Sequence, residues 1–113
     1  MIEEIVIRHL VGKGIAGGHV YAEVPLNPPA VYVLIQRSSG TITNQLRHLG
    51  LYTESRCRRS KLEAARLHED VIAAMRNIRD ETELFRCDLN AEYDAAMTQT
   101  KEYRYQALWE ITM

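Results

Sequence analysis

The last residues of the chain, 103 to 113, alternate in side-chain character almost to the final position. One set of alternate positions is aromatic or apolar and consists of Tyr103, Tyr105, Ala107, Trp109, Ile111 and Met113. The positions between them are polar except at Leu108. A period of two is typical of a strand with one face against a core. A strand of this length spans about 35 Å, so we expect it to lie within a sheet and to cover a helix or a neighbouring subunit.

The length and composition predict one globular domain over residues 1–113. A chain of 113 residues has the usual size for a single hydrophobic core. The apolar fraction of 46% and the charged fraction of 26% exclude global disorder. A net charge of −1 argues against a protein dedicated to nucleic-acid or membrane-surface binding.

The cysteine content and the apolar runs favour a protein folded in a reducing cytoplasm. Cys57 and Cys87 lie thirty residues apart with no further thiols, so we interpret both as reduced. The longest apolar run, Ala30 to Ile35, is far shorter than the roughly 20 residues that span a bilayer. We expect neither a signal peptide nor a membrane contact.

The first half of the chain predicts a helix followed by strands. Ile2, Ile5, Val6 and Leu10 recur at helical spacing before Gly12. A strand is expected over His19 to Val24, then an irregular link through three prolines. A central strand is expected over Ala30 to Gln36, a long hairpin loop or projecting ribbon over Arg37 to Arg47, and a third strand over Leu49 to Cys57.

The second half predicts the most regular helix and two further strands. Ser60 and Glu63 form a capping-box pattern, and six residues behind it share one helical face: Ala64, Leu67, Val71, Ala74, Met75 and Ile78. A short fourth strand is expected over Glu83 to Cys87, and a short element or a partner-ordered loop around Ala91 to Met97. The predicted fold class is α+β in the order α-β-β-β-α-β-β. Its mostly antiparallel sheet of four to five strands is packed by an N-terminal helix and one central helix.

Motifs that carry chemistry are weak in this sequence. Gly12 to Gly17 fits G-x-G-x-x-G, but it follows a helix and opens a strand, whereas dinucleotide binding needs the reverse context. His9 and His68 have no companion residues at metal-ligand spacing. We therefore predict no catalytic residues, no cofactor and no metal, and a protein that is not an enzyme.

Charge is distributed unevenly along the chain. Residues 37–66 carry seven Lys or Arg against two Glu, and residues 69–94 carry three Arg against eight Asp or Glu. The basic residues are compatible with a solvated rim, with phosphate contact and with a protein interface. Opposite charges on one chain suit a head-to-tail contact between identical subunits. The hypothesised subunit interface consists of Arg56, Arg58, Arg59, Lys61, Arg66, Asp80, Glu81 and Glu83.

The order of these elements resembles the small tail terminator, or tail completion, proteins of long-tailed bacteriophages. The resemblance covers nearly the whole chain and rests on the short first helix, the proline link Pro25-Leu-Asn-Pro-Pro29, the hydrophobic strand with its long hairpin loop, Ser60-x-x-Glu-Ala-Ala and the final Tyr-Arg-Tyr-x-Ala-x-Trp-Glu. It implies a hexameric ring that caps the tail tube, stops its polymerisation and joins it to the head–tail connector, while DNA passes through without sequence-specific binding. The implied location is the tail or neck of a virion assembled in the host cytoplasm.

The same resemblance makes the hairpin loop a candidate contact with the tail tube or connector. Its polar residues suit an adaptable surface on a rigid base: Arg37, Ser38, Ser39, Thr41, Thr43, Asn44 and Gln45. Other phage neck proteins, such as head-completion or connector subunits, are the nearest alternative. A small ferredoxin-like RNA-binding or regulatory domain that uses the arginine cluster is another, and so is a small enzyme whose site is assembled in space.

Overall fold

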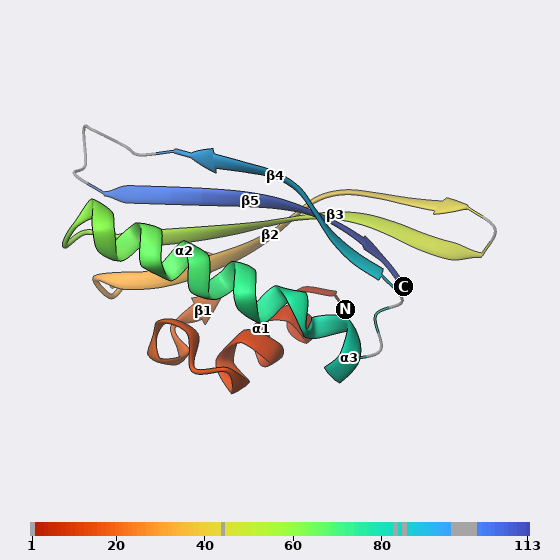
Figure 1. The fold of residues 1–113 in the computed structure, drawn as a ribbon, viewed down its shortest axis with the longest axis horizontal. Coiled ribbons are helices and arrows are strands. Elements are labelled where there is room, and N and C mark those ends of the chain that lie inside the picture. The colour runs from red at the N-terminus through yellow and green to blue at the C-terminus, as the bar shows by residue number, and fades with distance from the viewer. Residues whose placement is uncertain (1, 44, 83, 85, 96–101) are drawn as a thin grey trace.

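A computed structural model describes residues 2–43, 45–82, 84, 86–95 and 102–113 of the chain. Figure 1 shows one sheet with its helices gathered on one side. The elements in chain order are α1 (Ile2–Gly12), the 3-10 turn η1 (Ile15–Gly18), β1 (Val20–Tyr21), β2 (Val31–Thr43), β3 (Leu46–Cys57), α2 (Lys61–Arg76), α3 (Ile78–Glu81), β4 (Arg86–Asp94) and β5 (Tyr103–Thr112).

The sheet has five strands in the order β1-β2-β3-β5-β4. The β1–β2 pair is parallel, and the other three pairs are antiparallel. This arrangement confirms the predicted α+β class with a mostly antiparallel sheet. The β2–β3 hairpin continues past the helices as a long two-stranded arm at one end of the molecule (Figure 1).

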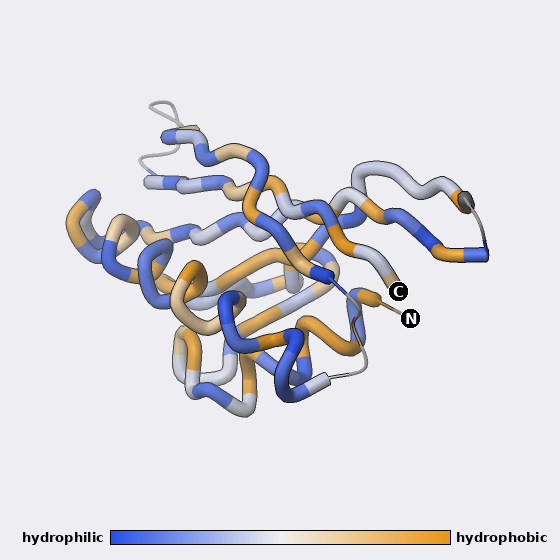
Figure 2. The backbone as a smooth tube through the Cα atoms, turned by 45° about the vertical axis from the view of Figure 1, so that its right-hand side comes forward, coloured by the Kyte–Doolittle hydropathy of each residue, from blue (hydrophilic) through white to orange (hydrophobic). Residues whose placement is uncertain are grey.

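The core lies between the helices and one face of the sheet. Ile2, Val6 and Leu10 of α1 are fully buried, as the helical spacing predicts. The alternation in β5 is also confirmed, because Ala107, Trp109 and Ile111 are all buried. Figure 2 shows the hydrophobic stretches gathered where helices and sheet meet, whereas the arm is mostly pale or hydrophilic apart from its tip.

The Ser60 half of the predicted capping box is present at the first turn of α2. The Glu63 backbone N–H donates to Ser60 Oγ at 3.1 Å, so the hydroxyl satisfies one free donor of the helix start. The Glu63 carboxylate contacts Cys57 Sγ at 3.6 Å and Arg59 at 3.7 Å. The predicted helix face included Ile78, but α2 ends at Arg76. Ile78 belongs to the separate short helix α3, which follows Asn77.

The early strands differ from the sequence expectation in length and position. The strand expected over His19 to Val24 is only two residues long, and it runs parallel to β2. The link from residue 22 to residue 30 contains the three prolines, which cannot donate to a ladder. The middle strand of the sheet is β3, while β2 pairs with β1 only at Val33 and Leu34.

The fourth strand also differs from the expectation. β4 covers residues 86 to 94, well beyond the short run predicted at Glu83 to Cys87. Its pairing with β5 shifts register between Leu89 and Ala91, and this bulge at Asn90 breaks the alternation that marks a strand in sequence. The element predicted around Ala91 to Met97 is thus the second half of β4 as far as Asp94. Glu83, Phe85 and residues 96–101 lie outside the described residues. Among the described helices, none is long and apolar enough to cross a membrane.

Candidate functional site: the open face of the sheet and its ribbon

The sheet face opposite the helices, here called the open face, presents rows of side chains from β2, β3, β5 and β4. Directly paired residues of neighbouring strands lie on the same face. One row contains Tyr32, Arg56 and Arg104, and the next contains Leu34, Glu54 and Gln106. The polar positions of the strands therefore come together on a surface that none of the described helices covers (Figure 1).

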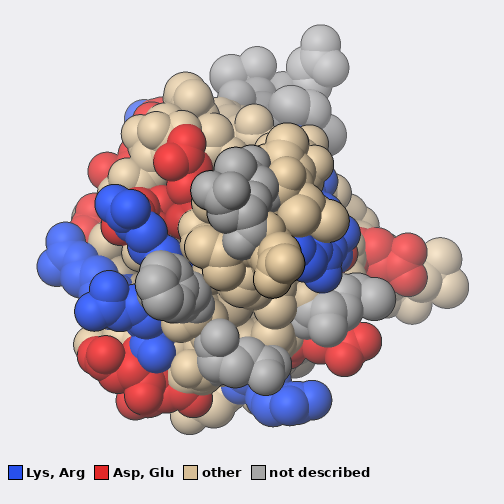
Figure 3. Space-filling model, turned by 90° about the vertical axis from the view of Figure 1, so that its right-hand side faces the viewer, with Lys and Arg blue, Asp and Glu red and all other residues tan. Residues whose placement is uncertain are grey.

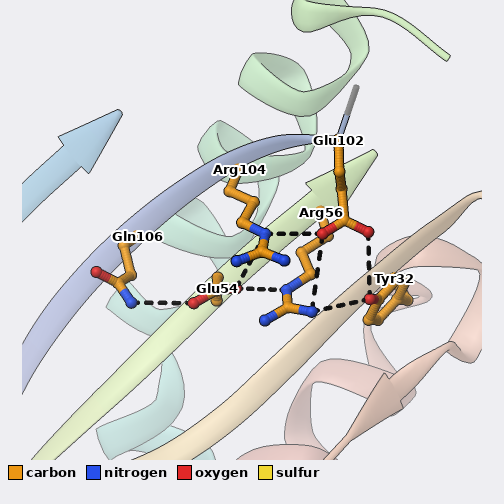
Figure 4. Close-up of polar contacts among 6 residues, drawn as sticks. All are labelled: Tyr32, Glu54, Arg56, Glu102, Arg104 and Gln106. Atoms are coloured by element: carbon orange, nitrogen blue, oxygen red, sulfur yellow. Dashed lines mark hydrogen bonds and ion pairs between the residues drawn. The ribbon is translucent and has the colours of Figure 1, made fainter. Parts of the chain in front are cut away.

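Six residues of the open face form a continuous polar network, shown in Figure 4. Arg56 bonds Glu54 through its Nε and donates to the Tyr32 hydroxyl at 3.1 Å. The remaining bonds run from Tyr32 Oη to Glu102 Oε2 at 3.4 Å, from Arg104 Nε to Glu102 Oε1 at 2.7 Å and from Gln106 Nε2 to Glu54 Oε2 at 3.0 Å.

The charged groups of the network pair with one another and are largely buried. The side chains of Arg56, Glu54 and Glu102 are only 12%, 8% and 10% exposed. Burial lowers the pKa of the Arg56 guanidinium, but hydrogen bonds to Tyr32 and Glu54 and the charge of Glu54 raise it further, so the net pKa lies above its usual range. Arg56 thus stays charged and neutralises carboxylates of its own chain.

Beyond the network, the open face is hollowed into a trough of about 440 Å³. Its walls come from four strands, and the residues include Ser38, Ser39, Thr41, His48, Gly50, Arg86, Asp88, Asn90, Leu108, Glu110 and Thr112. A β-carbon on Gly50 would lie 2.3 Å from Ser38 Oγ and 2.8 Å from Ser39 Oγ, so glycine lets the β2 bulge pack closely here. The trough carries both signs of charge, and hydroxyl groups outnumber apolar side chains.

The predicted contact loop is a regular hairpin extension, here called the ribbon and defined as residues 37–47. Arg37, Ser38, Ser39, Thr41 and Thr43 belong to β2. Gln45 has a φ of +67°, the left-handed backbone that a tight turn requires, and Asn44 lies outside the described residues. The sequence is compatible with a loop or a ribbon, and the pairing of Thr43 with Leu46 shows that the segment is a ribbon.

The ribbon is fixed at its base and exposed at its tip. Arg37 Nη2 donates to Glu3 Oε1 of α1 at 2.7 Å. At the other end, Ile42 is 72% exposed and Leu46 is 37% exposed, so the tip presents apolar side chains to solvent. In Figure 3, which views this end, uncharged residues occupy the centre and charged residues surround them.

The basic residues predicted at a subunit interface are largely engaged within their own chain. Arg56 belongs to the polar network, and Arg58 Nη2 donates to the Pro28 carbonyl at 2.9 Å. Arg59 lies 3.7 Å from Glu63, and Lys61 pairs with Asp94 at 3.0 Å. Arg66 is exposed on α2.

The predicted acidic partners lie at the other end of α2, on α3 (Figure 1). Glu81 accepts from Lys13 Nζ at 2.8 Å and faces His9 Nδ1 at 3.4 Å. Asp80 shares the same short helix, and Glu83 lies outside the described residues. The two charge groups are therefore separate within one subunit, and their contact between subunits stays a prediction.

Sequence reasoning missed most of the polar network. Tyr32, Glu54, Glu102, Arg104 and Gln106 were not singled out, because polar residues on alternate strand positions are usually solvated. The sequence gives one indication of the network. Alternate positions on one face of two predicted strands are polar, and they include Glu54, Arg56, Arg104 and Gln106.

Comparison with known proteins shows a likeness in structure. No protein-family model matches the chain, and no curated protein matches it in sequence. The fold is similar to that of a chain in the solved virion of a native gene transfer agent particle, with a TM-score of 0.62 and 12% sequence identity. The match covers 98% of this chain and 92% of that chain. The two chains share a fold along almost their entire lengths.

Proposed function

We propose that this chain is a structural subunit of a phage-type particle. The observation that carries the proposal is the whole-length likeness to a chain of the gene transfer agent virion, because neither chain has a sizeable part that the other lacks. The likeness is one of fold, and fold alone permits many functions. The exposed tip of the ribbon, which presents Ile42 and Leu46 to solvent, supplies the second support.

Within that class, we assign the chain to the tail terminator role. In this role it forms a ring, hexameric in the family it resembles, that caps the tail tube, stops its polymerisation and joins it to the head–tail connector. A ring subunit needs surfaces on two sides for its neighbours and surfaces on its ends for the tube and connector. The sheet has two open lateral edges, and the ribbon projects from one end of the molecule, which suits this division (Figure 1).

The ribbon is proposed to contact the tail tube or the connector. Its base is held by the Arg37–Glu3 bond, so its tip is placed rigidly, while Ile42 and Leu46 offer apolar contact area. Passing DNA would meet a subunit without sequence-specific contacts, and the proposed location is the virion. The proposal involves no catalysis and no cofactor.

The decisive experiment adds the purified protein to tail tube protein of the same particle under polymerising conditions. We expect rings in negative-stain electron micrographs, and tubes that stop growing with a ring at one end. The matched variant replaces residues 41–46 by a two-residue turn; it should fold normally and fail to cap. Tubes that grow to the same length with and without the protein would refute the terminator role.

A second role within the same class is a head-completion or connector subunit of the neck. The same fold likeness supports it, because the likeness is to a chain of the virion and does not select a position within the particle. Such a subunit would bind the portal-side complex and leave tube growth unchanged, so the capping experiment separates the two roles. A ferredoxin-like RNA-binding domain is less favoured, because the element order differs from β-α-β-β-α-β and Arg56 is committed to its own network.

A further inference from the structure

The two lateral edges of the sheet are both exposed strands of similar length. β4 forms one edge over Arg86–Asp94. On the other side, β1 covers β2 only at Val33 and Leu34, and the described residues from Gln36 to Ile42 are all exposed. An exposed strand edge is a template for pairing with another chain, and proteins usually block edges that must stay free. Gly40 to Thr43 contains neither proline nor charge.

Backbone alternation identifies the groups that each edge offers. Arg47 and Met113 exchange backbone hydrogen bonds between β3 and β5. Along a strand, successive residues direct their backbone N–H and C=O groups to opposite edges. Because Arg47 directs its groups at β5, its partner Ile42 directs its own groups away from β3, and so does Gly40 two residues earlier. By the same count, those of Leu89 on β4 point away from β5. Both edges therefore carry backbone groups that the described part of the sheet does not use.

The directions of the strands suit a cyclic arrangement of copies. Three antiparallel steps separate β2 from β4, so these strands run in opposite directions. When a second copy is related by rotation about an axis inclined to the strands, as in a β-barrel, its β2 edge meets the first copy's β4 edge in antiparallel orientation. The inclination accommodates the stagger of four residues between Ile42, which is level with Met113, and Leu89, which is level with Trp109. Such a heterologous contact repeats from copy to copy and closes a ring when the rotation allows.

Side chains and charge select β4 as the occupant of the β2 edge. Ile42 and Leu89 are 72% and 40% exposed, and the pairing register places both on the face of the sheet that bears the helices. Pairing them would cover two exposed apolar side chains together. The β4 strand carries three acidic residues and one arginine, whereas the ribbon carries Arg37 and Arg47 and no acid. A β4–β4 contact would oppose like charges.

We propose that the outer edge of β2 in one copy adds to the outer edge of β4 in the next copy, with Ile42 opposite Leu89, so that one continuous sheet runs from subunit to subunit. This inference rests on the ring of the proposed function and names its subunit contact. It differs from the charge contact between the basic end of α2 and α3, which is retained as the competing outcome.

Disulfide trapping tests the register directly. Opposed residues in an antiparallel ladder have Cα atoms about 5.5 Å apart, within disulfide range. The chain carrying both Ile42→Cys and Leu89→Cys should give a ladder of covalent oligomers under mild oxidation, and a mixture of the two single variants should give only dimers. Background is low, because Cys57 is buried and burial together with the Asp88 charge raises the pKa of the Cys87 thiol to about 12.

A second pair of variants tests the edge without cysteine chemistry. Ile42→Pro removes an outward N–H and leaves the β2–β3 ladder intact, and it should weaken association roughly tenfold for one lost hydrogen bond. Ile42→Val keeps the N–H and should associate like the wild type. Both variants should unfold within a few degrees of the wild type, which circular dichroism would verify.

The possible outcomes separate the inference from the proposed function. Dimers from Ile42→Cys alone would mean that β2 pairs with β2 and would overturn the inference. Rings that persist without the Ile42–Leu89 cross-link, and that the Arg58→Glu/Arg59→Glu variant dissolves, would overturn it in favour of the charge contact while leaving the proposed function in place. A protein that stays monomeric by light scattering at high concentration, alone and with tail tube protein, would overturn both.

Discussion

The β2–β3 hairpin has two halves with opposite properties. In the half that faces the helices, Val33, Ile35 and Leu51 are buried, and the opposite face holds the network around Arg56. In the ribbon, the same two strands stay paired beyond a register shift between Arg37 and Ser39, but the described residues from Gln36 to Ile42 are exposed on both faces. One hairpin therefore combines a half that holds the fold together with a half that contributes little to it. Residues whose burial is not needed for folding are available for assembly.

The first prediction concerns burial in the two halves. Trp109→Ala should lower the free energy of unfolding by about 3–5 kcal/mol, because a large side chain at 2% exposure and its bond to Thr53 Oγ1 are lost. Ile42→Ala in the ribbon should change it by less than about 0.5 kcal/mol. Urea denaturation followed by tryptophan fluorescence measures Ile42→Ala, and circular dichroism measures both. Equal losses would show that the ribbon is part of the cooperative core.

The second prediction concerns arginines in the two halves. Arg56→Met removes one of the two arginines that Glu54 and Glu102 share, because Arg104 still lies 2.7 Å from Glu102 and 3.8 Å from Glu54. It should cost about 3 kcal/mol, the lower end of the range for breaking a buried ion pair. Arg47→Met on the exposed ribbon is the matched control and should cost less than about 0.5 kcal/mol. The triple replacement of Arg56, Glu54 and Glu102 by apolar residues should recover part of the loss. A neutral Arg56→Met would mean that the network adds nothing to stability.

The parts of the fold that the sequence predicted are those with strong local periodicity. α1, α2 and β5 each show their buried face as a repeat along the chain, and the Ser60 cap is a local motif. β4 was only partly predicted, because the bulge at Asn90 shifts the alternation midway. The strand predicted at β1 was too long, because apolar residues continue beyond Tyr21 into the link, and the prolines of the link cannot join the ladder.

The candidate site depended on contacts that no local pattern records. Glu54 and Gln106 meet across 52 positions of sequence, and Tyr32 and Glu102 across 70. Only the strand order and register bring these side chains into one row, so alternation predicted polar positions and not their mutual bonds. The ribbon was recognisable from composition, whereas the free edges required the sheet order. The arginine cluster looked uniform in sequence, yet its members have different partners in space.

The smallest expected effect lies at the junction of the two halves, where Arg37 meets Glu3. Burial raises the pKa of the Glu3 carboxyl, but the hydrogen bond and charge of Arg37 lower it more strongly, so the folded pKa lies below the usual value. A lowered folded pKa means that the pair stabilises the protein above about pH 4.5, the ordinary value for a glutamate. This contribution is lost as the pH falls through the folded pKa.

Replacing Arg37 removes that stabilising partner. Arg37→Gln should raise the pKa of Glu3 and flatten the dependence of stability on pH between about pH 5 and pH 3, because the folded and unfolded values of the pKa then approach each other. NMR titration of the Glu3 carboxyl carbon measures the shift, and Arg47→Gln, farther along the ribbon, should leave it unchanged. If the Glu3 pKa were the same in both variants and the wild type, the ribbon would not be anchored to α1 through this bond. Its placement would then come from the β2–β3 ladder alone.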